Sequence, residues 1–380
     1  MYLIGTSSIL TKVIVKKRTK MGGVKSGEVM CEKDQPTMST LITPQELHTT
    51  LPRSQKSADT VTKTREQLIS ILNKQDDRLV VIVGPCSIHD PDSALRYAKK
   101  LRAEIQKHHG TLCIIMRAYL EKARTSTGWK GFVNDPHLNL TFEIQKGLHT
   151  ARSLLLAINE LGVPAGTEIL NPFIASYFSD LTSWAAIGAR TTESQVHREF
   201  AASLPMPVGF KNNTNGDIQV AIDAIQTAIQ PHHFLGVGIS GKITVMESPG
   251  NPHCHVVLRG SQHNTNYDDD SIDRTIAALN QCNLINQVMI DCSHGNTQKE
   301  YRQQLSVIDT LSTRIAKGDR KLLGVMLESH LIEGKQPWIP DQVMSGDQSI
   351  TDPCIGWEHT EIALNQLSHA VLIRRKNMLD

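Results

Sequence analysis

The sequence predicts an α/β fold: a (β/α)8 TIM barrel with an N-terminal extension and an inserted β-hairpin. Between residues 79 and 328, eight short apolar runs each lead to a charged, thiol or imidazole side chain. Stretches of helical pattern separate most of these runs, as in successive βα units. Because the active site of such a barrel lies at the carboxyl ends of its strands, the residues that end the runs are candidate site residues. They are Cys86, Arg117, Glu168, Arg190, Lys211, Arg259, His294 and Glu328.

The residues before the first run lie outside the barrel repeat. Residues 1–37 are rich in lysine and are expected to be a disordered tail, although a start at a later methionine would give the same pattern. Residues 38–78 are expected to form an extension that serves assembly or regulation. Thr43 and Glu46 have the spacing of a capping box at the start of its first helix. Two helices are predicted in this extension, Pro44–Thr49 and Ala58–Asn73.

Residues 79–380 are assigned to the catalytic barrel. Within them, residues from about 234 to 252 alternate in polarity and contain glycines, which predicts an inserted β-hairpin. Such insertions usually serve assembly or regulation. Between and after the strands, helices are expected at Pro91–His108, Ile144–Leu161, Ile174–Trp184, Glu193–Ser203, Asp217–Ala228, Ser271–Cys282, Gln298–Lys317 and His359–Lys376.

The composition excludes several classes of partner. The net charge of +2 provides no global attraction to nucleic acid or to an anionic membrane. An aromatic content of 4% argues against a surface that stacks bases. No apolar run approaches the roughly 20 residues that span a bilayer. Seven cysteines, an odd number, with Cys113, Cys254 and Cys292 in or beside buried-strand patterns, indicate reduced thiols and a cytoplasmic protein.

Cations at the ends of the runs predict an anion site. Each of them alone would be read as a solvated surface charge. Burying several on one rim would cost several kcal/mol per ion without an anion, so together they predict a phosphorylated acid as ligand. Gly188 and Ala189 add backbone N–H groups that can approach phosphate oxygens. The cations are Arg117, Lys122, Arg124, Arg190, Lys211 and Arg259.

A thiol, an imidazole and two carboxylates at or beyond strand ends form a candidate metal site: Cys86, His294, Glu328 and Asp352. This mixed set suits manganese, iron, cobalt or zinc better than magnesium or calcium. The spacing gives no support, because the chain has no CxxC or HExxH motif. Cys292 is a competing ligand, because it lies two residues before His294 and residues two apart on a strand share a face.

At these residues the sequence resembles 3-deoxy-D-arabino-heptulosonate 7-phosphate synthase of the type I class of bacteria and fungi. The resemblance extends from about residue 40 to the C-terminus. The motifs that carry it are GPCSIHDP (84–91), STGWKGFVNDPH (126–137), IGARTTESQVHRE (187–199), PVGFKN (207–212), SHGN (293–296), ESHLIEG (328–334) and SITDPCIGWE (349–358).

The resemblance implies a metal-dependent condensation of phosphoenolpyruvate with erythrose 4-phosphate and water, which releases phosphate. It implies one divalent metal ion per subunit, with manganese as first choice. Its ligands would be Cys86, His294, Glu328 and Asp352. Phosphoenolpyruvate would contact Arg117, Lys122, Gly188, Ala189, Arg190, Lys211 and Arg259. Erythrose 4-phosphate would contact Lys122, Arg124, Thr125 and Asp352.

Catalytic roles are expected for three residues of this set. Lys122 is the expected proton donor, with a pKa lowered by Arg117, Arg124 and the metal. Cys86 is expected to bind the metal as thiolate and His294 as neutral imidazole. Where family members read Lys-Pro-Arg-Thr, this chain has Ala123, which frees a φ angle that proline fixes.

The resemblance also implies regulation by an aromatic amino acid and a homodimer or homotetramer. Residues 171–176 and Pro205 depart from the family pattern in the effector region. Proline offers neither an N–H nor a hydroxyl to an effector, so weak or altered feedback inhibition is expected. Two alternative functions remain at this stage: 3-deoxy-octulosonate 8-phosphate synthase, and a non-catalytic paralogue that binds an amino acid. The resemblance gives Glu168 no direct role, and we expect its carboxylate to support the cationic cluster.

Overall fold

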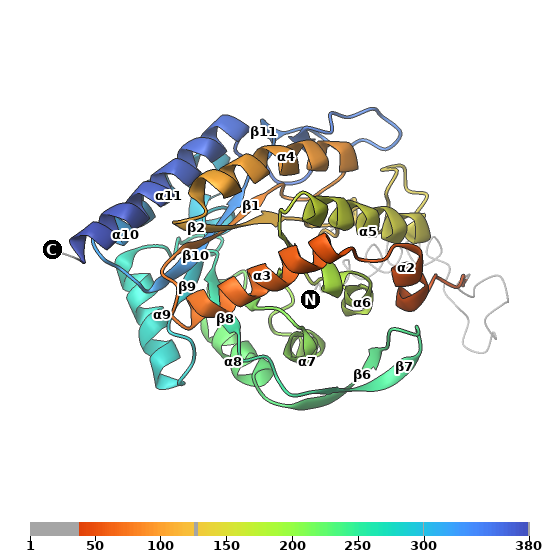
Figure 1. The fold of residues 1–380 in the computed structure, drawn as a ribbon, viewed down its shortest axis with the longest axis horizontal. Coiled ribbons are helices and arrows are strands. Elements are labelled where there is room, and N and C mark those ends of the chain that lie inside the picture. Colours follow the sequence, from red (N-terminus) through yellow and green to blue (C-terminus); the bar gives the residue numbers. More distant parts are fainter. Residues whose placement is uncertain (1–37, 125–127, 299, 379–380) are drawn as a thin grey trace, which may run out of the picture. The chain divides into compact units, whose positions relative to one another are not determined.

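The computed structural model describes residues 38–124, 128–298 and 300–378. Its eight parallel strands close into a barrel in the order β1-β10-β9-β8-β5-β4-β3-β2, which confirms the predicted fold class (Figure 1). The barrel strands are β1 (Leu79–Gly84), β2 (Leu112–Arg117), β3 (Ala165–Glu168), β4 (Trp184–Ile187), β5 (Val208–Lys211), β8 (Cys254–Leu258), β9 (Val288–Asp291) and β10 (Leu322–Glu328).

The strands read as continuous apolar runs because both of their faces are buried. In β1, Val80 and Ile82 belong to a cluster inside the barrel, whereas Leu79, Val81 and Val83 belong to the larger cluster that contains the apolar faces of the helices. Successive side chains of a strand point to opposite faces, so a strand between a filled barrel and a layer of helices is apolar at every position.

Helices cover the outside of the barrel (Figure 1). α4 has the predicted bounds because Asp90 caps it by accepting a hydrogen bond from Ser93 N, and Pro91 occupies its first turn. The described helices of the barrel are α4 (Pro91–His108), α5 (Ile144–Glu160), α6 (Ala175–Phe178), α7 (Gln195–Ser203), α8 (Gln219–Ala228), α9 (Asp269–Gln281), α10 (Gln304–Ala316) and α11 (Trp357–Asn377).

Two predicted helices are wrong in part. The single helix expected over 174–184 is replaced by three short pieces, η2 (Pro172–Ile174), α6 and η3 (Ser179–Leu181). It cannot extend to residue 184, because that residue is the first of β4. The helix expected from residue 298 begins at Gln304. Gln298 has the left-handed conformation, with φ of 49°, and two short turns, η4 (His294–Thr297) and η5 (Tyr301–Gln303), come first.

The N-terminal extension closes one end of the barrel. α2 (Pro44–Thr50) begins with the predicted capping box between Thr43 and Glu46. α3 (Gln55–Leu72) places Leu68, Ile71 and Leu72 in the same cluster as the interior residues of the barrel. In Figure 1, α3 crosses in front of the strands. The expected tail, residues 1–37, lies outside the described residues.

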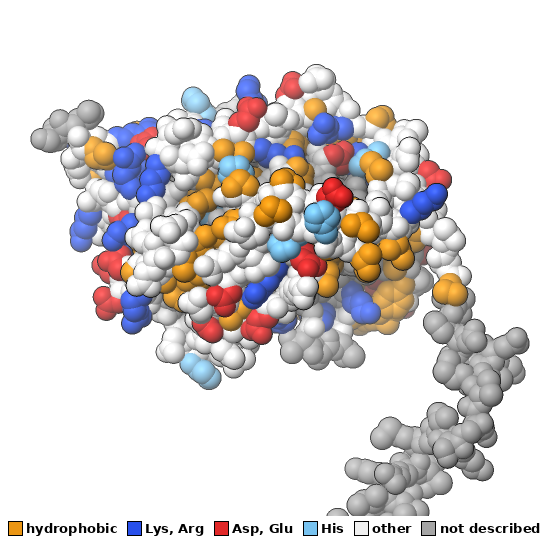
Figure 2. Space-filling view, turned by 90° about the horizontal axis from the view of Figure 1, so that it is seen from below, with side chains coloured by type: hydrophobic (Ala, Val, Ile, Leu, Met, Phe, Trp, Pro, Cys, Tyr) orange, Lys and Arg blue, Asp and Glu red, His pale blue; other side chains and the backbone are white. Residues whose placement is uncertain are grey.

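The predicted hairpin is present as β6 (His232–Val237) and β7 (Ile243–Ser248), which pair antiparallel. Its outer face is apolar and exposed: Leu235 is 75% exposed, Ile243 80% and Val245 61%. Figure 2 views the side on which the hairpin lies and shows orange hydrophobic side chains across the middle of this side.

A second small sheet, β11 (Ile332–Lys335) with β12 (Gln348–Ser349), was not predicted. None of the described helices is both long and apolar enough to cross a bilayer.

Candidate active site

Three of the four candidate metal ligands come together at the carboxyl ends of β1 and β10. The ligand atoms of Cys86, Glu328 and Asp352 all lie within 4.8 Å of one another. Cys86 Sγ is 3.4 Å from Asp352 Oδ2. A thiol with two carboxylates is a donor set for a borderline transition metal, so these residues fit the expected ion.

His294 lies at the edge of this group. Its Nε2 is 3.7 Å from Glu328 Oε1. The residue has φ of 55°, in the left-handed region that a residue with a side chain seldom adopts. The competing thiol, Cys292, is fully buried in the hydrophobic core, and its sulfur lies 3.7 Å from the carbonyl oxygen of Ile290.

Two glycines bring the loops after β8 and β9 together beside His294. Gly295 N donates to Arg259 O at 3.0 Å. A Cβ on Gly295 would lie 2.3 Å from Ser261 O, and one on Gly260, whose φ is 70°, would lie 2.5 Å from the carbonyl carbon of Gly295. Only glycine allows this approach, which sets Arg259 and His294 side by side at the barrel mouth.

Lys122 lies against the three ligands. Its Nζ is 2.9 Å from Cys86 Sγ and 2.8 Å from Asp352 Oδ2. Burial lowers the pKa of Lys122, but the Cys86 sulfur and the carboxylates of Asp352 and Glu328 outweigh this and raise it above its ordinary value. This direction is opposite to the expected lowering, because the three neighbouring ligands outweigh burial; the expectation also counted the charge of a bound metal.

The same contacts set the protonation of two ligands. The positive charge of Lys122 holds the pKa of Asp352 below its usual range. Burial raises the pKa of the Cys86 thiol to about 12, and the charge of Glu328 adds to this increase. The carboxylate is thus ready to bind a cation, whereas the thiol must first lose a proton.

Arg117 is buried, with 1% of its side chain exposed, and points into the site from the end of β2. Its Nη2 donates to Glu328 Oε1 at 3.1 Å, and its Nε donates to Pro85 O at 3.3 Å. The guanidinium also lies 3.9 Å from the centre of the Tyr119 ring. These contacts hold a permanent cation beside a candidate metal ligand.

Lys211 at the end of β5 is paired with a residue that was missing from the candidate list. Its Nζ donates to Asp291 Oδ2 at 2.8 Å, and Asp291 is fully buried. Burial alone would raise the pKa of Asp291, but His294 and Lys211 hold it well below its usual range. Asp291 is the last residue of β9, so the strand-end criterion could have found it.

The remaining phosphoenolpyruvate candidates surround the same mouth. Burial lowers the pKa of Arg259, and the nearby charge of Arg190 lowers it further. Gly188 and Ala189 lie in the turn after β4, where Gly188 O accepts from Thr191 N and Thr192 N. Two adjacent guanidinium groups favour a ligand with more than one negative charge.

Part of the erythrose 4-phosphate set lies farther out. Arg124 donates through Nε to Trp129 O at 2.8 Å and lines an open cavity of about 750 Å³ together with Lys335, Trp338 and Thr351. Thr351, which lines this cavity, directly precedes the metal-ligand candidate Asp352 in the chain. Thr125 lies outside the described residues.

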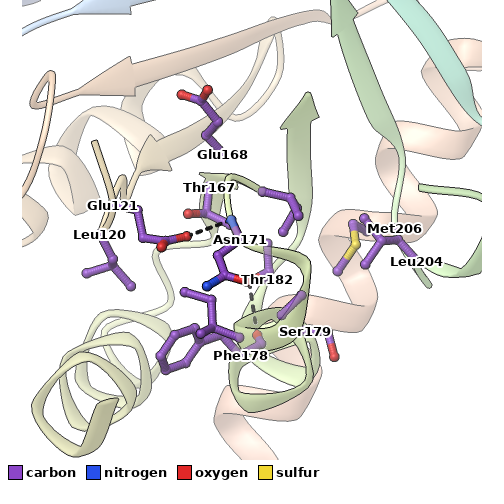
Figure 3. A pocket seen from close by; sticks show the side chains of 13 residues that line it. Leu120, Glu121, Thr167, Glu168, Asn171, Phe178, Ser179, Thr182, Leu204 and Met206 are labelled. Atoms are coloured by element: carbon purple, nitrogen blue, oxygen red, sulfur yellow. Dashed lines mark hydrogen bonds between the residues drawn. The ribbon is translucent and has the colours of Figure 1, made fainter. Parts of the chain in front are cut away.

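Glu168 lines a pocket beside β3. Burial lowers the pKa of Lys211, but Asp291 and Glu168 raise it, which agrees with the expected support of the cations by Glu168. Figure 3 shows a pocket between β3 and the short helices that follow it, in which the Glu121 carboxylate reaches Asn171 while Glu168 projects away from this contact. Glu121 Oε2 accepts from Asn171 N at 3.1 Å, and burial raises the pKa of Glu121 to about 7. A Cβ on Gly188 would lie 2.1 Å from Glu168 Oε1, so that glycine makes room for the carboxylate.

Known proteins share this arrangement of sequence and fold. The Phe-sensitive phospho-2-dehydro-3-deoxyheptonate aldolase of Escherichia coli K12 is 47% identical over 335 residues, 88% of this chain and 95% of the relative. The Trp-sensitive enzyme of Salmonella typhimurium is 46% identical over 334 residues, 88% of this chain and 96% of the relative. The structure of a phospho-2-dehydro-3-deoxyheptonate aldolase from Francisella tularensis matches with a TM-score of 0.88 and 43% identity, over 90% of this chain and 99% of that one.

The match to a known family covers most of this chain. A model of the DAHP synthetase I family matches residues 52–365, which include every candidate metal ligand and cation described above. This chain belongs to the DAHP synthetase I family.

Proposed function

We propose that this enzyme condenses phosphoenolpyruvate with D-erythrose 4-phosphate and water to 3-deoxy-D-arabino-heptulosonate 7-phosphate and phosphate, the first step of the shikimate pathway. The observation that carries the proposal is the convergence of Cys86, Glu328 and Asp352 within 4.8 Å, with cations around them at one barrel mouth. Such a site combines a Lewis acid with groups that bind polyanions.

The proposed metal ligands are Cys86, His294, Glu328 and Asp352, with one divalent ion per subunit. The thiol and imidazole favour manganese, iron, cobalt or zinc over magnesium, and manganese is our first choice. When bound, the ion supplies a Lewis acid for the aldehyde oxygen of erythrose 4-phosphate. Because the Cys86 thiol has a raised pKa, it is the ligand whose deprotonation accompanies binding.

The cations are proposed to hold phosphoenolpyruvate. Arg117, Arg190, Lys211 and Arg259 would pair with its carboxylate and phosphate, and backbone N–H groups near Gly188 and Ala189 would contact phosphate oxygens; Lys122 would complete the set. Support comes from the placement of Arg117 and Lys211 at the carboxyl ends of β2 and β5, where a carboxylate already stabilises each buried cation. The bound anion would share these cations with Glu328 and Asp291.

The reaction would then proceed between two oriented substrates. C3 of phosphoenolpyruvate attacks the aldehyde carbon of erythrose 4-phosphate, water adds at C2, and the hemiketal phosphate loses phosphate by C–O cleavage. Lys122 is the proposed proton donor to the aldehyde oxygen. Its raised pKa keeps it protonated at neutral pH, so the proton is present when the substrate binds. Arg124, Thr125 and Asp352 complete the proposed erythrose 4-phosphate contacts.

We propose that the protein is a cytoplasmic homodimer or homotetramer. The apolar outer face of the β6–β7 hairpin, with Leu235, Ile243 and Val245 mostly exposed, supports association through this insertion. Residues 38–78 are proposed as the part of the chain that serves assembly or regulation, since α2 contacts the hairpin through Gln45 N, which donates to Ile239 O at 2.9 Å.

Feedback inhibition by an aromatic amino acid is proposed to be weak or altered. The cavity beside Asn171 and Ala175 measures about 20 Å³, which is room for about one water molecule and not for an amino acid. Pro205, which removes a donor from the effector region, is exposed.

One assay tests the function and its alternatives. Purified protein stripped of metal receives manganese, phosphoenolpyruvate and one aldose phosphate at a time, and phosphate release is followed. We expect release with erythrose 4-phosphate. Release with arabinose 5-phosphate alone would favour the octulosonate synthase, and no release with either sugar would favour the non-catalytic paralogue.

A further inference from the structure

The carboxylate of Asp291 makes polar contacts with Lys211, His294 and Ser293. It is fully buried at the end of β9. Its Oδ2 lies 2.8 Å from Lys211 Nζ and 3.0 Å from His294 Nδ1. Its Oδ1 accepts from both Ser293 N at 3.0 Å and Ser293 Oγ at 2.7 Å. One oxygen atom therefore joins a candidate phosphoenolpyruvate cation to a candidate metal ligand.

These contacts determine which ring nitrogen of His294 carries the proton. Lys211 and the backbone N–H of Ser293 can only donate, so the Asp291 carboxylate is an acceptor. The single hydroxyl proton of Ser293 is given to Asp291 Oδ1, so toward His294 Nδ1, 2.7 Å away, Ser293 Oγ can only accept. Both neighbours of Nδ1 are acceptors, and Nδ1 must therefore be the donor.

A proton on Nδ1 leaves the lone pair of the neutral ring on Nε2. Nε2 is the nitrogen that faces the metal ligands, at 3.7 Å from Glu328 Oε1. The left-handed backbone of His294, with φ of 55°, keeps its side chain beside Asp291 three residues earlier. Such a conformation persists only where the surrounding structure enforces it.

We propose that Asp291 is a positioning residue that couples the two halves of the site. It fixes the Nδ1–H tautomer of His294, so that Nε2 is ready to bind the metal, and with the same oxygen it holds the Lys211 ammonium in place for phosphoenolpyruvate. The inference rests on the proposed function, because it takes His294 as a metal ligand and Lys211 as a substrate contact.

The first test measures the His294 tautomer in the wild-type protein. In the metal-free protein labelled with 15N-histidine, NMR long-range couplings report which ring nitrogen is protonated, and His294→Gln identifies the signals of His294. We expect the Nδ1–H tautomer. An Nε2–H tautomer would overturn the proposal.

The second test compares binding by calorimetry. Asp291→Asn keeps the shape but replaces one acceptor oxygen by an NH₂ donor, and we expect about a 10–100-fold weaker manganese affinity, as for other lost partners of metal-bound histidines. Phosphoenolpyruvate affinity should fall as well. Lys211→Gln should weaken only phosphoenolpyruvate, and Ser293→Ala, which leaves the Asp291–His294 contact, should retain most of the manganese affinity.

The outcomes separate this inference from the proposed function. A wild-type chain that binds no manganese would overturn both. Manganese bound by the wild type and equally tightly by Asp291→Asn would overturn this inference alone. A lower thermal midpoint for Asp291→Asn with unchanged manganese and phosphoenolpyruvate affinities would assign Asp291 a purely structural role and would also overturn it.

Discussion

Lys122 Nζ and Asp352 Oδ2 lie 2.8 Å apart, although 230 residues separate them in the chain. The pair joins the loop after β2 to the segment after β12, and Cys86 Sγ lies 2.9 Å from the same ammonium. The positive charge of Lys122 lowers the pKa of Asp352. Burial lowers the pKa of Lys122, but Cys86 and Asp352 outweigh this and raise it.

Replacing Lys122 by Met should lower kcat by about 100-fold or more, the usual effect of losing a proton donor. Because its pKa is raised, Lys122 should remain protonated at neutral and moderately alkaline pH. The rate of the wild-type enzyme should therefore show no fall at alkaline pH that is due to Lys122, and the alkaline parts of the wild-type and Lys122→Met profiles should have the same shape. An alkaline limb that does disappear in this variant would show that Lys122 loses its proton in that range.

Replacing Cys86 by Ala should abolish the activity that manganese restores to the stripped enzyme, since the thiolate is a proposed ligand. The matched control is Cys292→Ala, because that thiol is fully buried in the hydrophobic core, with its sulfur 3.7 Å from Ile290 O. Phosphate release and manganese content are measured for both variants. Equal manganese content in Cys86→Ala and the wild type would contradict the ligand assignment.

Manganese affinity should rise with pH through the neutral range. Burial raises the pKa of Cys86 to about 12, so the thiol is protonated at neutral pH and must release about one proton when it binds the metal. Calorimetric titration in buffers of different ionisation enthalpy counts the released protons. The assignment of Cys86 as thiolate ligand fails if binding releases none.

Replacing Arg117 by Leu should destabilise the metal-free protein by about 3–5 kcal/mol, because it leaves the buried Glu328 carboxylate without its partner. Manganese should recover part of this loss by binding Glu328. Thermal or urea unfolding with and without manganese measures both effects. The control is Arg302→Ala, which breaks the exposed pair with Glu333 and should leave the unfolding transition unchanged.

Phenylalanine, tyrosine and tryptophan should each inhibit the enzyme weakly. The cavity beside Asn171 has room for about one water molecule, so an effector would have to displace the short helices around it. Initial rates measured against increasing concentrations of each amino acid test this. Full inhibition by micromolar phenylalanine would refute the prediction.

Local patterns were sufficient for most of the fold. The barrel strands were recognisable because burial on both faces demands continuous apolar runs, and α4 because Asp90 and Pro91 specify its start. Local patterns failed at 174–184, where helical periodicity continues to Trp184 although that residue is needed as the first of β4. Pairing of β4 with its neighbours overrode the helical preference.

The sequence by itself determined the closed barrel, the polar strand ends that line its mouth, and, through resemblance, the family. Only the tertiary structure brought Asp352 next to Lys122 and Asp291 between Lys211 and His294. The physical reason is that a pKa or a tautomer depends on charges and acceptors within a few ångströms, and these come from strands far apart in the chain. The sign of the Lys122 pKa shift and the role of Asp291 followed from those distances.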